Sequence, residues 1–259
     1  MNRPRKRFGQ NFLHDAAVIE RIVRAINPRP DQAAVEIGPG RAAITVPLLA
    51  AFGELDVIEI DRDLVAALRN RFPPGSKLRV HENDALRFDF RELAKERGQK
   101  LRVIGNLPYN ISTPLLFHLL DQADAIEDMH LMLQKEVVDR MAARTGQKAY
   151  GRLTVMLAQC CRVESLFTVG PGAFKPPPKV ESAVVRVIPL EPPPLSVRDH
   201  ERFARIVNQA FSQRRKTLRN AVKGLASEAM IEAAGLKPTV RPEQVTPEQF
   251  AQLADIAVP

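Results

Sequence analysis

The first two thirds of the chain alternate between short apolar runs and segments whose apolar residues have helical spacing. After Asp15, apolar residues at 18–26 recur three or four positions apart, which predicts a helix capped by Asp15 and ended by Pro28. The expected strands that follow are 33–37, 55–60, 77–81, 101–104 and 129–133, and the expected helices are 42–51, 63–71, 114–120 and 137–144. Such alternation predicts an α/β fold with a doubly wound, mostly parallel sheet.

The pattern changes in the last third of the chain. Segments 162–169 and 182–188 predict strands joined without a helix, so we expect an antiparallel pair, and Pro192 to Pro194 then form a stiff connector. Beyond it the pattern is helical: Thr246 and Gln249 predict a capping box for a final helix, and one apolar helical face consists of Phe203, Ile206, Val207, Ala210 and Phe211. We therefore predict a catalytic domain over residues 1–194 and a small all-α domain over 195–259.

The composition of the chain indicates what kind of partner it binds and in which compartment it works. In this chain of 259 residues, 38 Lys and Arg outnumber 30 Asp and Glu, giving a net charge of +8, which favours a polyanion such as nucleic acid, although basic surfaces also serve solubility. The adjacent Cys160 and Cys161 suit neither an ordinary disulfide nor a metal site, so we expect a reduced, cytoplasmic setting and no metal. The chain shows no membrane-spanning run and no apolar signal core, while its basic start leaves a transit peptide open.

A glycine turn follows the first strand of the alternating region. Gly38 and Gly40 precede a helix and would let a nucleotide-like ligand approach the backbone, and Glu59 at the end of the next strand could accept both ribose hydroxyls. The same pair is typical of dinucleotide enzymes, but Ala42 stands where a third glycine would be and Pro39 removes an amide donor. An adenosyl cofactor, a dinucleotide and an ordinary turn all remain open from this motif alone.

Asp84 follows the expected strand 77–81. It would lie at the same sheet edge as Glu59 and could accept a hydrogen bond from an adenine amino group. Taken alone it is equally compatible with a helix cap, the role we expect of Asp61 and Asp63.

The tetrapeptide Asn106, Leu107, Pro108 and Tyr109 follows the strand 101–104, one residue beyond its end. If the Asn106 amide oxygen and the Leu107 carbonyl each accept one hydrogen of an adenine amino group, its lone pair points at an incoming methyl group. Pro108 would hold Leu107 extended, and Tyr109 could stack on the base. No histidine base is required, because the methylated nitrogen becomes acidic and loses its proton afterwards. A plain strand-to-helix turn is the alternative.

Phe174 lies among glycines and prolines and is a candidate to pack on the opposite face of the base; a core-facing position is the alternative. A target adenine would have to be unstacked to enter such a pocket, which favours loops over paired stems.

Two basic clusters are candidate phosphate contacts, with a solvated surface as the alternative reading. Because the chain has two tyrosines and no tryptophan, recognition of folded RNA by shape and backbone fits better than tracking of a single strand. The first cluster is Arg3, Arg5, Lys6 and Arg7, and the second is Arg214, Arg215, Lys216, Arg219 and Lys223.

Taken together, these motifs resemble the bacterial 16S ribosomal RNA adenine N6-dimethyltransferases of the ribosomal RNA adenine dimethylase family, over nearly the whole chain. The resemblance rests on Gln10-Asn11-Phe12-Leu13, Glu36-Ile37-Gly38-Pro39-Gly40, Asn106-Leu107-Pro108-Tyr109-Asn110-Ile111-Ser112, and the segment from Phe174 to Ser182. It implies a Rossmann-like class I methyltransferase fold with S-adenosylmethionine as cofactor. The cofactor contacts that it implies are Asn11, Leu13, Gly38, Glu59, Asp84 and Asn106, and the adenine contacts are Asn106, Leu107, Tyr109 and Phe174.

The resemblance further implies two methyl transfers to each of two adjacent adenosines near the 3′ end of small-subunit RNA, in an assembling subunit. We expect a monomer. Arg41 and Ala42 depart from the more glycine-rich loop usual in relatives and leave the cofactor affinity open. The alternatives are a large-subunit dimethylase conferring antibiotic resistance, a noncatalytic RNA-binding assembly factor and, last, a nicotinamide-dependent oxidoreductase.

Overall fold

The computed structural model describes residues 11–256. The chain forms two compact units, each assembled from two segments. The first unit is Met1–Val138 with Glu164–Pro189, and the second is Asp139–Val163 with Leu190–Pro259. Gln10 and the first basic cluster lie outside the described residues.

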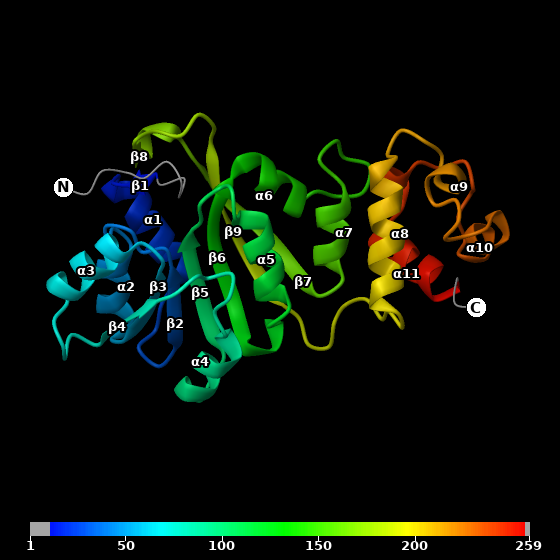
Figure 1. Cartoon of the computed structure of the whole chain (residues 1–259). Helices are drawn as coiled ribbons and strands as arrows, with labels where there is room; N and C mark the ends of the chain where they lie inside the picture. Colours follow the sequence, from blue (N-terminus) through cyan, green and yellow to red (C-terminus); the bar gives the residue numbers. More distant parts are fainter. Residues whose placement is uncertain (1–10, 257–259) are drawn as a thin grey trace. The chain divides into compact units, whose positions relative to one another are not determined.

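The first unit is built on a seven-stranded sheet in the order β4-β3-β2-β5-β6-β9-β7 (Figure 1). Neighbouring strands from β4 to β6 run parallel, and β9 runs antiparallel to β6. The predicted strands 162–169 and 182–188 are neighbours in this sheet. The strands are β2 (Ala33–Ile37), β3 (Leu55–Glu59), β4 (Leu78–Glu82), β5 (Leu101–Asn106), β6 (Ile126–Gln134), β7 (Cys161–Val169) and β9 (Ser182–Pro189). The predicted doubly wound α/β fold is confirmed.

Two short strands form a second, two-stranded sheet. β1 (Phe12–Leu13) pairs antiparallel with β8 (Phe174–Lys175), and Leu13 lies opposite Phe174. This pairing ties the start of the described chain to a segment far along the sequence.

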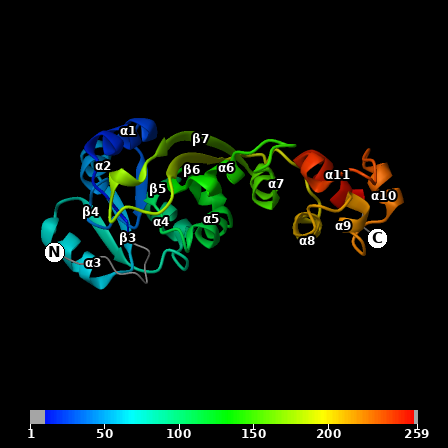
Figure 2. The ribbon, with the colours of Figure 1, turned by 90° about the horizontal axis from the view of Figure 1, so that it is seen from above.

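Helices cover both faces of the large sheet, α1 and α2 on one face and α4 and α5 on the other (Figure 2). The Asp15 carboxylate caps α1 as predicted, accepting hydrogen bonds from the Ala17 and Val18 amides at 2.9 and 3.0 Å. Helix α4 was not predicted, because its sequence is mostly charged. The helices that begin in this unit are α1 (Ala16–Ile26), α2 (Thr45–Phe52), α3 (Arg62–Arg71), α4 (Phe90–Arg97), α5 (Ser112–Leu120) and α6 (Lys135–Met141), with 3₁₀ turns η2 (Ala123–Ala125) and η3 (Pro171–Ala173); α6 continues into the second unit.

The strand order determines where a ligand can bind. The chain moves outward from β2 through β3 to β4 and then returns to β5 on the other side of β2. Such a reversal leaves a crevice at the carboxyl ends of the central strands, because the connections on either side lead away from each other. The glycine turn after β2 and the tetrapeptide, which starts at the last residue of β5, both begin at this crevice.

The second unit is helical. Its core includes the fully buried Tyr150, Phe203 and Phe250, and the Tyr150 hydroxyl donates a hydrogen bond to the Val245 carbonyl at 2.7 Å. The predicted capping box is present, since the Thr246 amide donates to Gln249 at 3.0 Å and the Gln249 amide donates to Thr246 at 3.3 Å. The helices are α7 (Arg152–Ala158), α8 (His200–Ser212), α9 (Leu218–Ala221), α10 (Glu228–Ala233) and α11 (Pro247–Ile256), with the 3₁₀ turn η4 (Pro242–Gln244).

The compact units group residues 139–163 with the C-terminal helices, an arrangement that the sequence did not indicate. The physical reason is burial, because Tyr150 and Val155 complete the apolar core formed by residues after 194. The division of function between residues 1–194 and 195–259 stays a prediction. Cys160 and Cys161 are free thiols with sulfur atoms 3.6 Å apart.

Candidate active site

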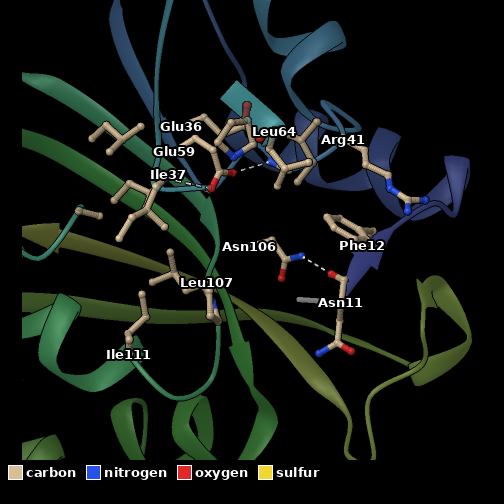
Figure 3. Close-up of a pocket in the computed structure, with 18 of the residues that line it drawn as sticks. Asn11, Phe12, Glu36, Ile37, Arg41, Glu59, Leu64, Asn106, Leu107 and Ile111 are labelled. Carbon is tan, nitrogen blue, oxygen red and sulfur yellow. Dashed lines mark hydrogen bonds between the residues drawn. The ribbon is translucent and has the colours of Figure 1, made fainter. Parts of the chain in front are cut away.

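A cavity of about 260 Å³ opens at the carboxyl ends of β2, β3, β4 and β5 in the first unit (Figure 3). It brings together residues that are far apart in the sequence but were predicted to act at one site. Those that line it are Asn11, Leu13, Gly38, Glu59, Asp84, Asn106, Leu107, Pro108 and Tyr109.

The glycine turn adopts the left-handed backbone that glycine favours. Gly38 has φ 68° and Gly40 has φ 55°, and a Cβ atom at Gly40 would lie 3.2 Å from the Phe12 ring. Ala42 is also left-handed, with φ 62°, and α2 therefore begins at Thr45 rather than at the predicted residue 42. The third glycine position of the motif is thus occupied by a strained alanine in the same type of turn.

Glu59 ends β3 with a carboxylate that the protein holds in place. Its Oε1 accepts hydrogen bonds from the Ile60 and Asp61 amides, both at 3.0 Å, and its Oε2 accepts one from the Gly40 amide at 3.3 Å. Burial raises the pKa of Glu59 above its ordinary value, and these amide hydrogen bonds oppose the rise. The side chain is therefore oriented before any ligand arrives and can accept ribose hydroxyls.

Glu36 is a second buried acid at this cavity, one that the sequence did not single out as a site residue. It is 2% exposed, and burial raises its pKa to about 7, with Glu59 adding a smaller effect of the same sign. Within the described chain its Oε2 has no hydrogen-bond partner. A buried carboxyl group of this kind is more stable as a carboxylate beside a positive charge, which a cationic ligand would bring.

Asp84 lies in the turn after β4. Its Oδ1 accepts a hydrogen bond from the Leu86 amide at 3.0 Å, so the side chain shapes the turn and lines the cavity at once. Asp61, in contrast, caps α3 by accepting from the Asp63 amide at 3.0 Å, as expected.

The Asn106 amide group has a defined orientation. Its nitrogen donates a hydrogen bond to the Asn11 carbonyl at 3.2 Å, and its oxygen points away from Asn11 (Figure 3). Residue 11 is thus a neighbour of Asn106 as well as part of the cavity lining. An amide group carries its N–H donors and its oxygen acceptor on opposite sides. Since the nitrogen side bonds to the protein, the oxygen side faces a ligand.

The backbone of the tetrapeptide is held by β6 and by its own turn. The Leu107 amide donates to the Met132 carbonyl at 3.1 Å, and the Pro108 carbonyl accepts from the Ile111 amide at 3.2 Å. Leu107 is buried at 1% exposure. The peptide therefore leaves the strand extended and turns only after Pro108, as its proline predicts.

Tyr109 has its ring at the cavity and its hydroxyl in a hydrogen bond. The Tyr109 hydroxyl and Ser182 Oγ are 2.7 Å apart, and Ser182, at the start of β9, is 1% exposed. Ser112 Oγ donates to the Tyr109 carbonyl at 3.1 Å. Burial raises the pKa of Tyr109, while the hydrogen bond to Ser182 opposes the rise. The ring is therefore fixed at both ends.

Phe174 lies elsewhere. Its side chain is 3% exposed and packs in the core cluster that contains Leu13 and Val184, and it is not among the described residues that line the cavity. This is the core-facing position that the sequence left open. A stacking role for Phe174 would need a rearrangement of β8 and stays a prediction.

Sequence reasoning missed three residues of the site besides Glu36. A Cβ atom at Gly105 would lie 2.7 Å from Leu107 Cδ2 and 3.1 Å from the Ile37 carbonyl, so a larger residue would displace the Leu107 side chain and crowd the end of β2. A glycine inside a strand was the available signal. Ser182 gave no signal of a site role, because it acts through the distant Tyr109. Arg41 was noted only as a departure in the glycine-rich loop, and its contact with the Phe12 ring could not be read from the sequence.

The lining fits a cationic adenosyl ligand. Carboxylates can take ribose hydroxyls and an adenine amino group and can balance a sulfonium or ammonium charge. Within residues 11–256 no cluster of three or more metal-binding side chains occurs. No helix in the same range is long and apolar enough to span a bilayer.

Comparison with known proteins agrees with this geometry. The family model described as ribosomal RNA adenine dimethylase matches residues 1–258. Proteins named Ribosomal RNA small subunit methyltransferase A from Pseudomonas aeruginosa and Nitrosococcus oceani are both 58% identical to the chain. The alignments cover 98% and 97% of this chain and 94% and 95% of those proteins, respectively.

Two crystal structures share the fold. A dimethyladenosine transferase from Plasmodium falciparum is 26% identical, with a TM-score of 0.78 over 93% of this chain and 95% of that one. The 23S rRNA methyltransferase ErmE is 27% identical, with a TM-score of 0.74 over 95% of this chain and 99% of that one.

The sheet, the glycine turn and the acids at the strand ends define a class I S-adenosylmethionine-dependent methyltransferase, and both the predicted cofactor and the predicted enzyme class are confirmed. Within this class the chain belongs to the ribosomal RNA adenine dimethylase family. The family resemblance seen in the sequence is therefore confirmed, and the oxidoreductase alternative is not supported.

Proposed function

We propose that this enzyme transfers methyl groups from S-adenosylmethionine to N6 of two adjacent adenosines near the 3′ end of small-subunit ribosomal RNA, producing N6,N6-dimethyladenosines. The observation that best supports this chemistry is the hydrogen bond from the Asn106 amide nitrogen to the Asn11 carbonyl at 3.2 Å, because it leaves the Asn106 oxygen facing a ligand. The choice of the small subunit is supported by full-length relatives of that name at 58% identity, compared with 27% for the large-subunit enzyme ErmE.

In the proposed site, Glu59 accepts the ribose hydroxyls and Asp84 accepts the adenine amino group of the cofactor, while Asn11, Leu13 and Gly38 line the rest of its path. When bound, the cofactor supplies an electrophilic methyl group on a sulfonium with a neutral leaving group. The positions of these residues at one cavity support the assignment.

At the target base, the Asn106 oxygen and the Leu107 carbonyl accept the two amino hydrogens. This draws the N6 lone pair out of conjugation with the ring and points it at the methyl group. Pro108 keeps Leu107 extended, and Tyr109 stacks on the base with its ring held by Ser182. After transfer the nitrogen carries a positive charge and loses a proton to solvent. In the second transfer the monomethylated nitrogen has one hydrogen left, so only one of the two oxygens can accept it, and the second product nitrogen loses that last proton in turn.

The helical C-terminal domain is proposed to dock RNA through its basic cluster. In that cluster Arg214 is tied to its own unit, with Nε 2.8 Å from Glu243 Oε2 and Nη1 donating to the Lys148 carbonyl at 2.8 Å. Arg215 and Lys216 are exposed and are the better phosphate contacts. Reversing both charges should weaken RNA binding and reduce its salt dependence, whereas reversing the exposed Lys95 in α4 of the first unit should not.

We further propose that the enzyme acts in the cytoplasm as a monomer on an assembling small subunit. A direct test incubates unmethylated small subunits, naked small-subunit RNA and large subunits with methyl-labelled S-adenosylmethionine and maps the labelled adenines. Label confined to adjacent adenosines of small-subunit RNA supports the proposal. Label on large-subunit RNA instead would favour a resistance dimethylase, and no label on any RNA would favour a noncatalytic assembly factor.

The same assay tests Asn106. Asn106→Ala should lower kcat by roughly 10²- to 10³-fold, the loss expected when a group that stabilises the transition state is removed. Asn70→Ala, the same change at an exposed position of α3 that does not line the cavity, is the control and should retain activity. Full labelling by the Asn106 variant would contradict the assigned role.

A further inference from the structure

Two free thiols lie next to each other where α7 leads into β7 (Figure 1). Cys160 is partly exposed, whereas Cys161, the first residue of β7, is 6% exposed. Their sulfur atoms are 3.6 Å apart, so the two side chains are in contact. They are the two cysteines of the chain, and neither lines the cavity of the candidate active site. The pair therefore lies outside the groups proposed for methyl transfer.

The contact makes the two thiols unequal in reactivity. The hydrogen bond with Cys161 lowers the pKa of the Cys160 thiol, and burial opposes this effect. For Cys161 the same pairing raises the pKa, and burial adds to the rise. Cys160 is thus the better nucleophile as well as the more exposed of the two. An accessible thiol of lowered pKa beside a second thiol is the arrangement typical of redox-sensing cysteines.

We infer that Cys160 and Cys161 form a redox modification site, at which hydrogen peroxide converts the two thiols into a disulfide between adjacent residues. The Cys160 thiolate attacks one peroxide oxygen and the O–O bond breaks, which leaves a sulfenic acid on Cys160 and a hydroxide that takes a proton from solvent. The Cys161 sulfur then attacks the Cys160 sulfur. The S–S bond forms, the S–O bond breaks, and the departing hydroxide takes the Cys161 proton as a second water.

The burial of Cys161 does not prevent this sequence of steps. Peroxide has to reach Cys160 alone, because Cys161 reacts with the sulfur that it already touches. The two thiols lose the electrons that peroxide gains, so no further oxidant or reductant is needed.

The position of the pair predicts a disulfide that is easily reduced. Adjacent Cα atoms are about 3.8 Å apart across a trans peptide, whereas ordinary disulfides join Cα atoms about 4.4–6.8 Å apart. The main chain is held on both sides, since the Cys160 amide donates to the Leu157 carbonyl at 3.1 Å and the Cys160 carbonyl accepts from the Leu190 amide at 2.9 Å. The ring must therefore close under strain, and strained disulfides are the labile ones. Such a bond suits the cytoplasm proposed above, in which disulfides form transiently.

The test follows the mass and the thiols of the whole enzyme. Reduced enzyme is treated with hydrogen peroxide and then analysed by intact mass spectrometry, peptide mapping and thiol titration. The chain should lose two hydrogens and both titratable thiols, and the loss should map to the peptide that contains residues 160 and 161. Excess dithiothreitol should restore both thiols, which it cannot do for a sulfinic acid. A non-reducing gel should show a single chain.

Serine variants assign the two roles. Cys161→Ser should stop at the sulfenic acid of Cys160, which dimedone labels. Cys160→Ser should react at least about tenfold more slowly with peroxide, because the remaining thiol is buried and mostly protonated. The double variant Cys160→Ser/Cys161→Ser is the matched control, since it has no thiol and reports oxidation of the six methionines alone.

The wild-type measurements decide the question even if a variant fails to fold. Addition of oxygen to the cysteines without loss of hydrogen, a disulfide that joins two chains, or thiols that dithiothreitol does not restore would overturn the inference. Equal dimedone labelling of the wild type and Cys161→Ser would overturn it as well, because Cys161 should remove the sulfenic acid from the wild type.

Discussion

The two ends of the cavity are constructed differently. At the proposed cofactor end, the Glu59 carboxylate accepts hydrogen bonds from the amides of residues 40, 60 and 61, and the Asp84 carboxylate accepts one from the Leu86 amide. These amides belong to the same turn as the acid or, for residue 40, to the adjacent glycine turn. At the target end, Asn106 is held by Asn11, and Tyr109 by Ser182. Local turns therefore orient the groups proposed to bind the cofactor, whereas distant segments orient the groups proposed to contact the base.

This difference means that the two ends respond differently to mutation. Acids in the turns remain oriented as long as their strands form, because main-chain amides hold them. The tetrapeptide at 106–109 depends on the Asn11 carbonyl next to β1, the Met132 carbonyl of β6 and the Ser182 hydroxyl of β9. Four substitutions test the contrast, and they follow from the largest expected effect to the smallest.

Phe174→Ala should lower the free energy of unfolding by about 3–5 kcal/mol, because it leaves a cavity in a packed core behind β1. Phe174→Leu should lose less, since it fills most of that space. Urea unfolding measures both, and methylation assays on the folded fractions show whether activity follows stability. Loss of activity in Phe174→Leu with unchanged stability would instead place Phe174 at the target base.

Glu36→Gln should stabilise the ligand-free enzyme at high pH. The folded pKa of about 7 lies above the ordinary value of 4.5, so the protein loses stability as pH rises from 4.5 to 7, and the cost stays constant above that range. The full cost is of the order of 3 kcal/mol. Thermal unfolding should give the variant a higher melting temperature relative to the wild type at pH 8 than at pH 5. Equal differences at both pH values would contradict the raised pKa.

Ser182→Ala should reduce kcat/KM for RNA roughly fivefold, about 1 kcal/mol, because the Tyr109 ring loses the hydrogen bond that orients it. Tyr109→Phe removes the same bond from the other side, so the double variant should be hardly worse than either single one. Ser212→Ala in the second unit is the control. Additive losses in the double variant would show that the two hydroxyls act separately.

Ala42→Gly should change stability by no more than about 1 kcal/mol. Glycine removes the backbone strain of a left-handed alanine, which costs about 1–2 kcal/mol. It also removes a buried methyl group, whose burial stabilises the fold by about 0.8 kcal/mol. The control is Ala43→Gly, since Ala43 is not left-handed and glycine there should only destabilise. Urea unfolding that shows both variants losing equal stability would rule out strain at Ala42.

Much of the site was accessible from the sequence because its parts lie at strand ends in a regular fold. The Asp15 cap, the capping box at Thr246 and the cavity position of Asp84 all follow from local patterns of a few residues. Helix α4 was missed because five of its eight residues are charged. The packing of residues 139–163 with the C-terminal helices was not indicated either, because their apolar side chains contact a distant segment.

The sequence by itself determined the alternating fold, the family and the residue types of the chemistry, because these depend on periodicity and on short motifs. Tertiary structure decided that Asn106 presents its oxygen, that Ser182 holds Tyr109, that Phe174 faces the core and that Arg41 lies beside Phe12. The physical reason is that an orientation depends on the partner atom. For these side chains the partner lies on another strand, at a distance along the chain that no local pattern records.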